Sequence, residues 1–121
     1  MFVRWKTRIP RQPWYKDFPH RNPGKSFSAE LVRSERVDGQ PRQKVVAYLG
    51  HIKEKYLDVP SRRYHFWEHV DQQLKALGVS LAERQRIEAR LSAVVARATV
   101  EEAEQSRREA MEGLLRIAGR V

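Results

Sequence analysis

Residues 27–52 read FSAELVRSERVDGQPRQKVVAYLGHI and contain the strongest secondary-structure signal in the chain. Two runs with apolar and β-branched residues, 27–37 and 44–52, flank Asp38-Gly39. Asp-Gly between such runs favours a two-residue turn in which both residues take positive φ. We therefore predict a β-hairpin in which the numbers of opposed residues add up to 77.

In this register, one face of the hairpin is apolar at its base and charged toward its tip. The expected apolar residues are Phe27, Ala29, Leu31, Val46 and Tyr48. Toward the tip, Glu35 would face Arg42, which is favourable, and Arg33 would face Lys44, which is unfavourable unless an anion lies between them. A longer loop through Gln40-Pro41 would shift the register by one residue and exchange the faces. The distal hairpin is basic in either register.

The N-terminal residues alternate in polarity, with Val3, Trp5, Thr7 and Ile9 on one side and Arg4, Lys6 and Arg8 on the other. This period of two predicts a strand with one buried face and one cationic face, which ends at Pro10. Residues 10–25 then combine four prolines with three aromatic side chains, which predicts an extended loop or arm. Its aromatic rings would pack on the core or stack on bases.

Helical spacing of apolar residues begins after Pro60. Ser61 is expected to cap a first helix that ends at Gly78, and capping boxes at Ser80–Glu83 and Thr99–Glu102 predict two further helix starts. Strands followed by helices indicate an α+β fold, with an antiparallel sheet of two or three strands and then two or three α-helices. We expect a basic β module at 1–58 and a helical region at 59–121.

The positive charge is confined to the first half of the chain. Residues 1–65 hold 15 Lys and Arg against 6 Asp and Glu, a net charge of +9, whereas residues 66–121 hold 9 of each. A confined excess attracts polyanions, and phosphate contacts release counterions. The alternative is a solvated basic face without a partner. The candidate phosphate-binding residues are Arg4, Lys6, Arg8, Arg11, Lys16, Arg21, Lys25, Arg33, Arg36, Arg42 and Lys44.

One short motif suggests a metal site. His65-Phe66-Trp67-Glu68-His69 matches H-x-x-E-H, the signature of inverted zincins, in which two histidines share a metal and the glutamate acts as a base. That family needs a further carboxylate from a much larger fold, so we expect a half-exposed helix start and no metal. No P-loop, dinucleotide-binding glycine pattern or nucleophile elbow is present. We therefore expect a non-enzymatic protein without a cofactor.

The segment Leu77-Gly78-Val79-Ser80 resembles the turn of a helix-turn-helix motif. The helix after it would offer arginines to a DNA groove. Glu83 and Glu88 interleave with those arginines, so a helical hairpin or a partner surface is favoured.

Cellular location is indicated by what the sequence lacks. Cysteine is absent, which fits a reducing compartment. No secretory signal is apparent, and no apolar run approaches 18 residues. We expect a cytoplasmic protein that does not enter a membrane.

Residues 1–8 together with residues 31–50, LVRSERVDGQPRQKVVAYLG, resemble the N-terminal β-hairpin module of insertion-sequence DDE transposases. The resemblance covers about residues 1–53 and implies a DNA-associated β module with Arg33, Arg36, Arg42 and Lys44 at the matching basic positions. The remaining residues leave no room for the ribonuclease-H-like catalytic domain, so transposase activity is not expected. The insertion at 10–25 also departs from the family's compact pattern.

These observations predict a DNA-associated accessory or mobile-element-derived protein that contacts phosphates through its first half. DNA is favoured over RNA. One alternative is an RNA-binding structural subunit of a ribonucleoprotein. Another is an interaction protein that binds a partner, or itself, through helices in residues 80–121.

Overall fold

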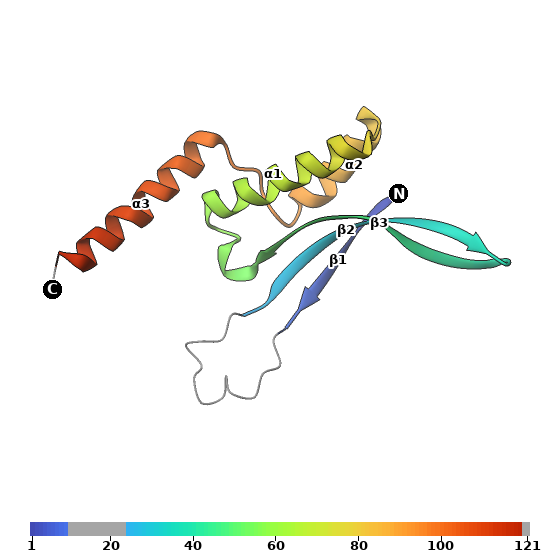
Figure 1. Cartoon of the computed structure of the whole chain (residues 1–121), viewed down its shortest axis with the longest axis horizontal. Coiled ribbons are helices and arrows are strands. Elements are labelled where there is room, and N and C mark those ends of the chain that lie inside the picture. Colours follow the sequence, from blue (N-terminus) through green and yellow to red (C-terminus); the bar gives the residue numbers. More distant parts are fainter. Residues whose placement is uncertain (10–23, 120–121) are drawn as a thin grey trace.

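The computed structural model describes residues 1–9 and 24–119. Three antiparallel strands, β1 (Phe2–Arg8), β2 (Ser26–Val37) and β3 (Gln40–Lys53), form one sheet in the order β1-β2-β3. A short 3-10 helix, η3 (Glu54–Tyr56), leads into α1 (Pro60–Leu77), α2 (Leu81–Ser92) and α3 (Val100–Ala118) (Figure 1). The predicted α+β architecture is confirmed.

The hairpin turn forms as the Asp-Gly signal predicts. Asp38 has φ 53° and Gly39 has φ 76°, so both central residues lie in the left-handed region that this turn requires. The pairing from Val37 opposite Gln40 down to Val32 opposite Val45 keeps the predicted sum of 77. Both the turn and the register of the tip are confirmed.

Nearer the base, the register of β2 and β3 changes twice. Leu31 pairs with Ala47, and Ala29 pairs with Gly50, so β3 gains a residue at each shift. Each extra residue reverses which side of the sheet the following side chains face. Tyr48 consequently pairs with Glu30 and is 45% exposed. The prediction that Tyr48 belongs to the core face is wrong.

One hydrophobic core joins the sheet to the helices. Its largest members from the helices are Phe66 and Trp67 of α1, and the Trp5 ring of β1 stacks on Phe66 at a centroid distance of 6.1 Å. β3 contributes Leu49 and Ile52 to the core, and Val46 is only half-buried. The buried members of this core are Val3, Ala29, Leu31, Leu49, Ile52, Phe66, Trp67, Val70, Leu74, Ile87, Leu91 and Val95. Within the part of the chain that the structure describes, α1 and α2 lie on one side of the sheet (Figure 1).

The helix ends follow local capping rules, with one exception. α1 begins at Pro60 with Val59 as its N-cap, because proline at the first helical position needs no N–H partner, so the predicted Ser61 cap is wrong. Gly78 ends α1 with φ 65°, as expected. The Ser80 hydroxyl accepts a hydrogen bond from the Glu83 backbone N–H at 3.2 Å. At the start of α3, both hydrogen bonds of the Thr99 capping box form.

Among the described residues, contacts to α3 gather near its start. Ala103 is buried where α3 meets α1, and the Ser106 and Ser61 hydroxyl oxygens lie 3.3 Å apart. The last turns extend away from the sheet (Figure 1), and Met111, Leu114, Leu115 and Ile117 are 58–68% exposed. Among residues 1–9 and 24–119, no helix has the length and hydropathy needed to span a membrane.

Candidate nucleic-acid interface

The sheet has a polar outer face on the side opposite the core. On β1, Val3 and Trp5 point into the core, so the alternating residues Arg4, Lys6 and Arg8 point outward. They pair with Glu30, Ser28 and Ser26 of β2. These three residues pair in turn with Tyr48, His51 and Lys53 of β3. The outer face therefore runs across all three strands.

Glu30 is the carboxylate at the centre of the outer face. Arg4 Nη2 donates to Glu30 Oε2 at 2.7 Å, and Lys6 Nζ lies 3.4 Å from Glu30 Oε1. The Arg4 hydrogen bond is the main cause that lowers the pKa of Glu30, with Lys6 adding to it and partial burial opposing it. Arg4 also donates to Gln43 Oε1 at 3.1 Å. Arg4 is therefore held in a fixed position by two acceptors.

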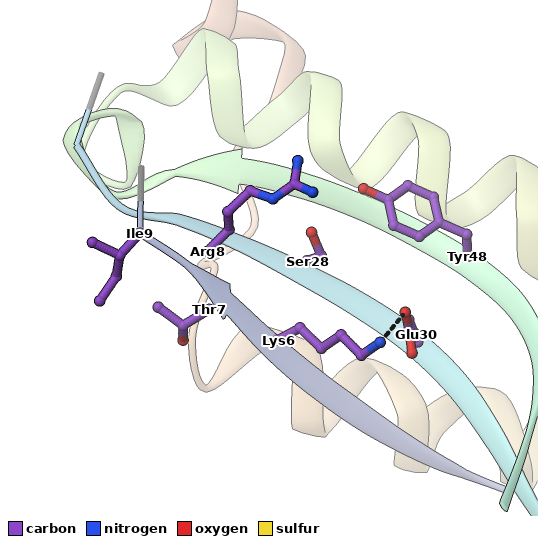
Figure 2. Close-up of a pocket in the computed structure, with 7 residues that line it drawn as sticks. All are labelled: Lys6, Thr7, Arg8, Ile9, Ser28, Glu30 and Tyr48. Carbon is purple, nitrogen blue, oxygen red and sulfur yellow. Dashed lines mark ion pairs between the residues drawn. The ribbon is translucent and has the colours of Figure 1, made fainter. Parts of the chain in front are cut away.

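An open depression of about 630 Å³ lies on this face. Figure 2 shows Arg8 and Tyr48 extending toward each other from the outer strands, above Ser28, with Lys6 directed at Glu30. Within the described residues, Arg8 forms no ion pair. The lining residues are Lys6, Thr7, Arg8, Ile9, Ser28, Glu30 and Tyr48. This floor of hydroxyls with cations at its edge suits a phosphate group.

The hairpin extends past the rest of the sheet. β1 pairs with β2 only as far as Phe2 opposite Val32, so residues 33–44 form a ribbon of two strands (Figure 1). Pairing and alternation place Arg33, Glu35, Arg42 and Lys44 on one face of this ribbon. Ser34, Arg36, Pro41 and Gln43 occupy the other face, which continues the outer face of the sheet. The ribbon therefore carries cations on both faces.

The eleven candidate phosphate-binding residues fall into separate groups. Arg4, Lys6, Arg8 and Arg36 share the outer face, whereas Arg33, Arg42 and Lys44 lie on the opposite face of the ribbon. Lys25 is exposed just before β2. Arg11, Lys16 and Arg21 lie outside the described residues, as does most of the predicted loop at 10–25.

Sequence reasoning missed several residues near this interface. Tyr48 reaches the outer face only through the register shift between Leu31 and Val32, for which the sequence carried no signal. Lys55 of η3 and Arg62 of α1 both lie over the Tyr56 ring, at 5.1 and 4.5 Å from its centroid. Two cations therefore gather where η3 leads into α1. Their charge was visible in the sequence, but their clustering was not.

The H-x-x-E-H motif does not assemble a metal site in the described residues. No group of three or more His, Cys, Asp or Glu side chains there has the geometry to hold a metal ion. His65 and His69 line one pocket, whereas Glu68 lines a separate depression that contains Asp71. His69 Nδ1 donates to the Leu49 carbonyl oxygen at 2.6 Å.

Two of the arginines that follow the helix-turn-helix-like segment are engaged within the protein. Arg84 binds Asp71 and Glu88, each at 2.9 Å. Arg97 binds the same two carboxylates and lies 4.1 Å from the centre of the Trp67 ring. These contacts raise the pKa of Arg84, chiefly through its hydrogen bond to Glu88. They join α1 to α2, which favours a structural helical hairpin.

A protein-family model matches more than half of the chain. The model described as IS1634 family transposase, N-terminal domain, matches residues 21–89. This segment contains the hairpin, η3, α1 and the larger part of α2. The comparisons with curated proteins and with solved structures find no match.

Proposed function

The chain belongs to the family of IS1634 transposase N-terminal domains, and we propose that it binds duplex DNA through its outer face and hairpin ribbon. The resemblance to insertion-sequence transposases in the sequence is confirmed by the family match. Binding to DNA is the role that the basic sheet supports best. In this role the chain contributes attachment to DNA and no chemistry of its own.

The observation that carries this proposal is the presence of cations on both faces of a free two-stranded ribbon. A DNA groove is bounded by two phosphate strands, so a ribbon inserted into it has phosphates on each side. Arg36 would face one strand, and Arg33, Arg42 and Lys44 would face the other. A single-stranded nucleic acid would place phosphates against only one of these faces. The arrangement therefore favours a duplex.

The dimensions of the ribbon fit the major groove. Five residues separate Val32 from Val37, which gives a projection of about 17 Å at ~3.4 Å per residue. The major groove of B-DNA is about 12 Å wide and about 8.5 Å deep and admits a two-stranded ribbon. The deep and narrow major groove of duplex RNA does not. DNA is therefore favoured over RNA.

The outer face would contact the phosphate backbone beside the groove. Arg4, Lys6 and Arg8 are spaced two residues apart along β1, which is about 6.8 Å between neighbours. Each phosphate contact releases counterions and makes the negative slope of log K against log salt steeper by about 0.9. Phosphate contacts position the protein, and base contacts within the groove would have to supply any sequence preference.

The test is fluorescence-anisotropy titration of the full chain against duplex DNA, single-stranded DNA and duplex RNA of equal length across a salt series. We expect the tightest binding to duplex DNA, with a steep decrease as salt rises. A variant with Arg36→Ala should lose affinity, and so should one with Arg42→Ala, because each removes a cation from a different face. Equal and weak binding to all three polymers, with a flat salt dependence, would contradict the proposal.

A second candidate role is weak self-association through α3, which the exposed side chains of Met111, Leu114, Leu115 and Ile117 favour. A standard interface buries about 800 Å² per partner, and four side chains provide roughly half of that. Pairing with a second copy would thus be weak in solution and would depend on two copies sharing one DNA. Sedimentation velocity of the chain with and without a duplex should show two copies only with DNA. Single-copy complexes at every protein concentration would rule out this role.

A further inference from the structure

We propose that a pocket between β3 and α1 is a second phosphate-binding site, which acquires its positive charge by protonation of histidines. This inference rests on the proposed binding to DNA and adds a pH-dependent contact to it. The pocket has a volume of about 170 Å³. Its lining residues are Tyr48, Gly50, His51, His65, Phe66 and His69.

Histidines from different elements converge on this pocket. His51 comes from β3, and His65 and His69 come from successive turns of α1. Three of the four histidines of the chain thus border one small pocket. Imidazole is the side chain whose charge ordinarily changes between about pH 5 and pH 8. The pocket is therefore lined by rings that become cationic when they take up a proton.

The pocket lies beside the outer face. Tyr48 lines both this pocket and the depression that contains Lys6 and Arg8. The Tyr48 and His51 rings lie 6.4 Å apart between centroids. A DNA backbone that crosses the outer face and passes the edge of β3 would meet the pocket next. Its phosphate group is the anion that the site would take.

The hydrogen bond of His69 fixes which of its ring nitrogens carries a hydrogen. The Leu49 carbonyl oxygen can only accept, so Nδ1 of His69 carries a hydrogen in both the neutral and the charged ring. A second proton must therefore bind at Nε2. Protonation at Nε2 leaves the hydrogen bond from Nδ1 to the backbone in place and adds one positive charge.

The charged groups around the pocket define how protonation and binding are linked. The sheet brings Arg8 and Lys53 to the same face as His51, and α1 has Arg62 one turn before His65. Of the nearby carboxylates, Glu30 is bound by Arg4 and Lys6, and Glu68 lines a separate depression. A phosphate bound in the pocket would favour the charged form of these rings. DNA binding should therefore take up protons.

The experiment compares three proteins on one duplex at pH 5.5 and pH 8, at constant ionic strength and across a salt series. The first is the parent chain. The second carries His51→Gln and His65→Gln, which removes the titratable charge. The third carries His51→Lys and His65→Lys, which makes the charge permanent. Circular dichroism at each pH confirms that all three remain folded, and His69 is kept because it binds the backbone.

We expect the parent to bind several-fold more tightly at pH 5.5 than at pH 8, with a salt slope steeper by about 1 to 2, as expected for one or two added contacts. The glutamine variant should lose this increase in affinity at pH 5.5. The lysine variant should bind tightly at both pH values. Inorganic phosphate at constant ionic strength should compete more strongly with DNA at pH 5.5 than at pH 8. Equal competition at both pH values would contradict the proposal.

Two results separate failure of this inference from failure of the proposed function. If the parent binds duplex DNA and the glutamine variant keeps the full pH dependence, the pocket is not the site, although the chain still binds DNA. If the parent binds no duplex at either pH, the proposed function itself is wrong.

Discussion

Arg33 of β2 lies directly opposite Lys44 of β3 in the part of the hairpin that extends past β1. Like charges in opposed positions destabilise a sheet by up to about 1 kcal/mol. The Glu35 carboxylate, two residues along, accepts a hydrogen bond from Arg33 and faces Arg42 in the register. These four side chains carry three positive charges and one negative charge, a net of +2. This net positive charge would attract an anion to this face of the ribbon.

Replacement of this pair, Arg33→Ala with Lys44→Ala, should weaken binding to duplex DNA and leave the fold intact. The slope of log K against log salt is negative, and the loss of two phosphate contacts should make it shallower by about 1.8. The free energy of unfolding should stay within about 1 kcal/mol of the parent, because removal of the repulsion between Arg33 and Lys44 offsets loss of the exposed Arg33–Glu35 ion pair. Anisotropy titrations across a salt series and urea unfolding measure the two effects.

The control for this pair is Lys75→Ala with Arg108→Ala, which removes the same charge from exposed positions on α1 and α3. This variant should keep most of the affinity. An equal loss in both variants would show that net charge alone governs binding, and the ribbon would then have no special role.

Glu30→Gln should change how stability depends on pH. The Arg4 hydrogen bond lowers the pKa of Glu30 in the folded protein below its value in the unfolded chain, about 4.3. The associated stability is therefore present above that value and is lost as pH falls through the lower folded pKa. The stability of the variant should lack this dependence on acid. At pH 7 its free energy of unfolding should be lower than that of the parent by less than about 1 kcal/mol.

Urea unfolding between pH 3 and pH 7 tests this prediction. Glu104→Gln is the control, because Glu104 is exposed and forms no ion pair within the described residues. The control should follow the parent at every pH. If Glu30→Gln also follows the parent, the Arg4 contact contributes nothing to folding.

Asp71→Asn should loosen the contact between α1 and α2. Asp71 accepts hydrogen bonds from Arg84 at 2.9 Å and from Arg97 at 3.2 and 3.3 Å, and Arg97 lies over Trp67. Loss of a partly exposed ion-pair network should cost about 1 kcal/mol of unfolding free energy. Urea unfolding should show this decrease while affinity for duplex DNA stays close to that of the parent. A large loss of DNA affinity in a folded variant would assign the helical hairpin to the interface.

The local features of the fold could be predicted because short segments determine them. Asp38-Gly39 specifies the turn, alternation specifies β1, and Gly78 and Thr99 specify helix ends. Each of these depends on the conformational preferences of a few neighbouring residues. The cationic side of β1 followed from the same alternation.

The faces near the base of the hairpin could not be predicted, because they depend on tertiary packing. The two shifts in β3 turn Leu49 into the core and Tyr48 out of it. Nothing local to residues 44–52 specifies where an extra residue is inserted. The pocket beside α1 depends on the same shifts. His65 and His69 were visible as part of a motif, but nothing in the sequence showed that they share a pocket with His51.

Gly50→Ala should destabilise the protein at the second of these shifts. Gly50 has φ 155°, and a Cβ there would lie 3.3 Å from two atoms of the Phe66 ring and 3.6 Å from His69 Nδ1. The backbone strain and the crowding of a buried ring should together cost about 1 to 3 kcal/mol of unfolding free energy. Thermal and urea unfolding should both show the decrease.

Gly113→Ala is the matched control, because a Cβ at Gly113 meets no atom within 4 Å and the residue lies within α3. Alanine in an exposed helix is favoured over glycine by about 1 kcal/mol, so this variant should be slightly more stable than the parent. The opposite signs of the two glycine substitutions separate close packing against Phe66 from a general effect of glycine removal. If Gly50→Ala is as stable as the parent, β3 must reach α1 without the close approach described at Gly50. The bulges would then be less rigidly fixed by packing than the contact between Gly50 and Phe66 indicates.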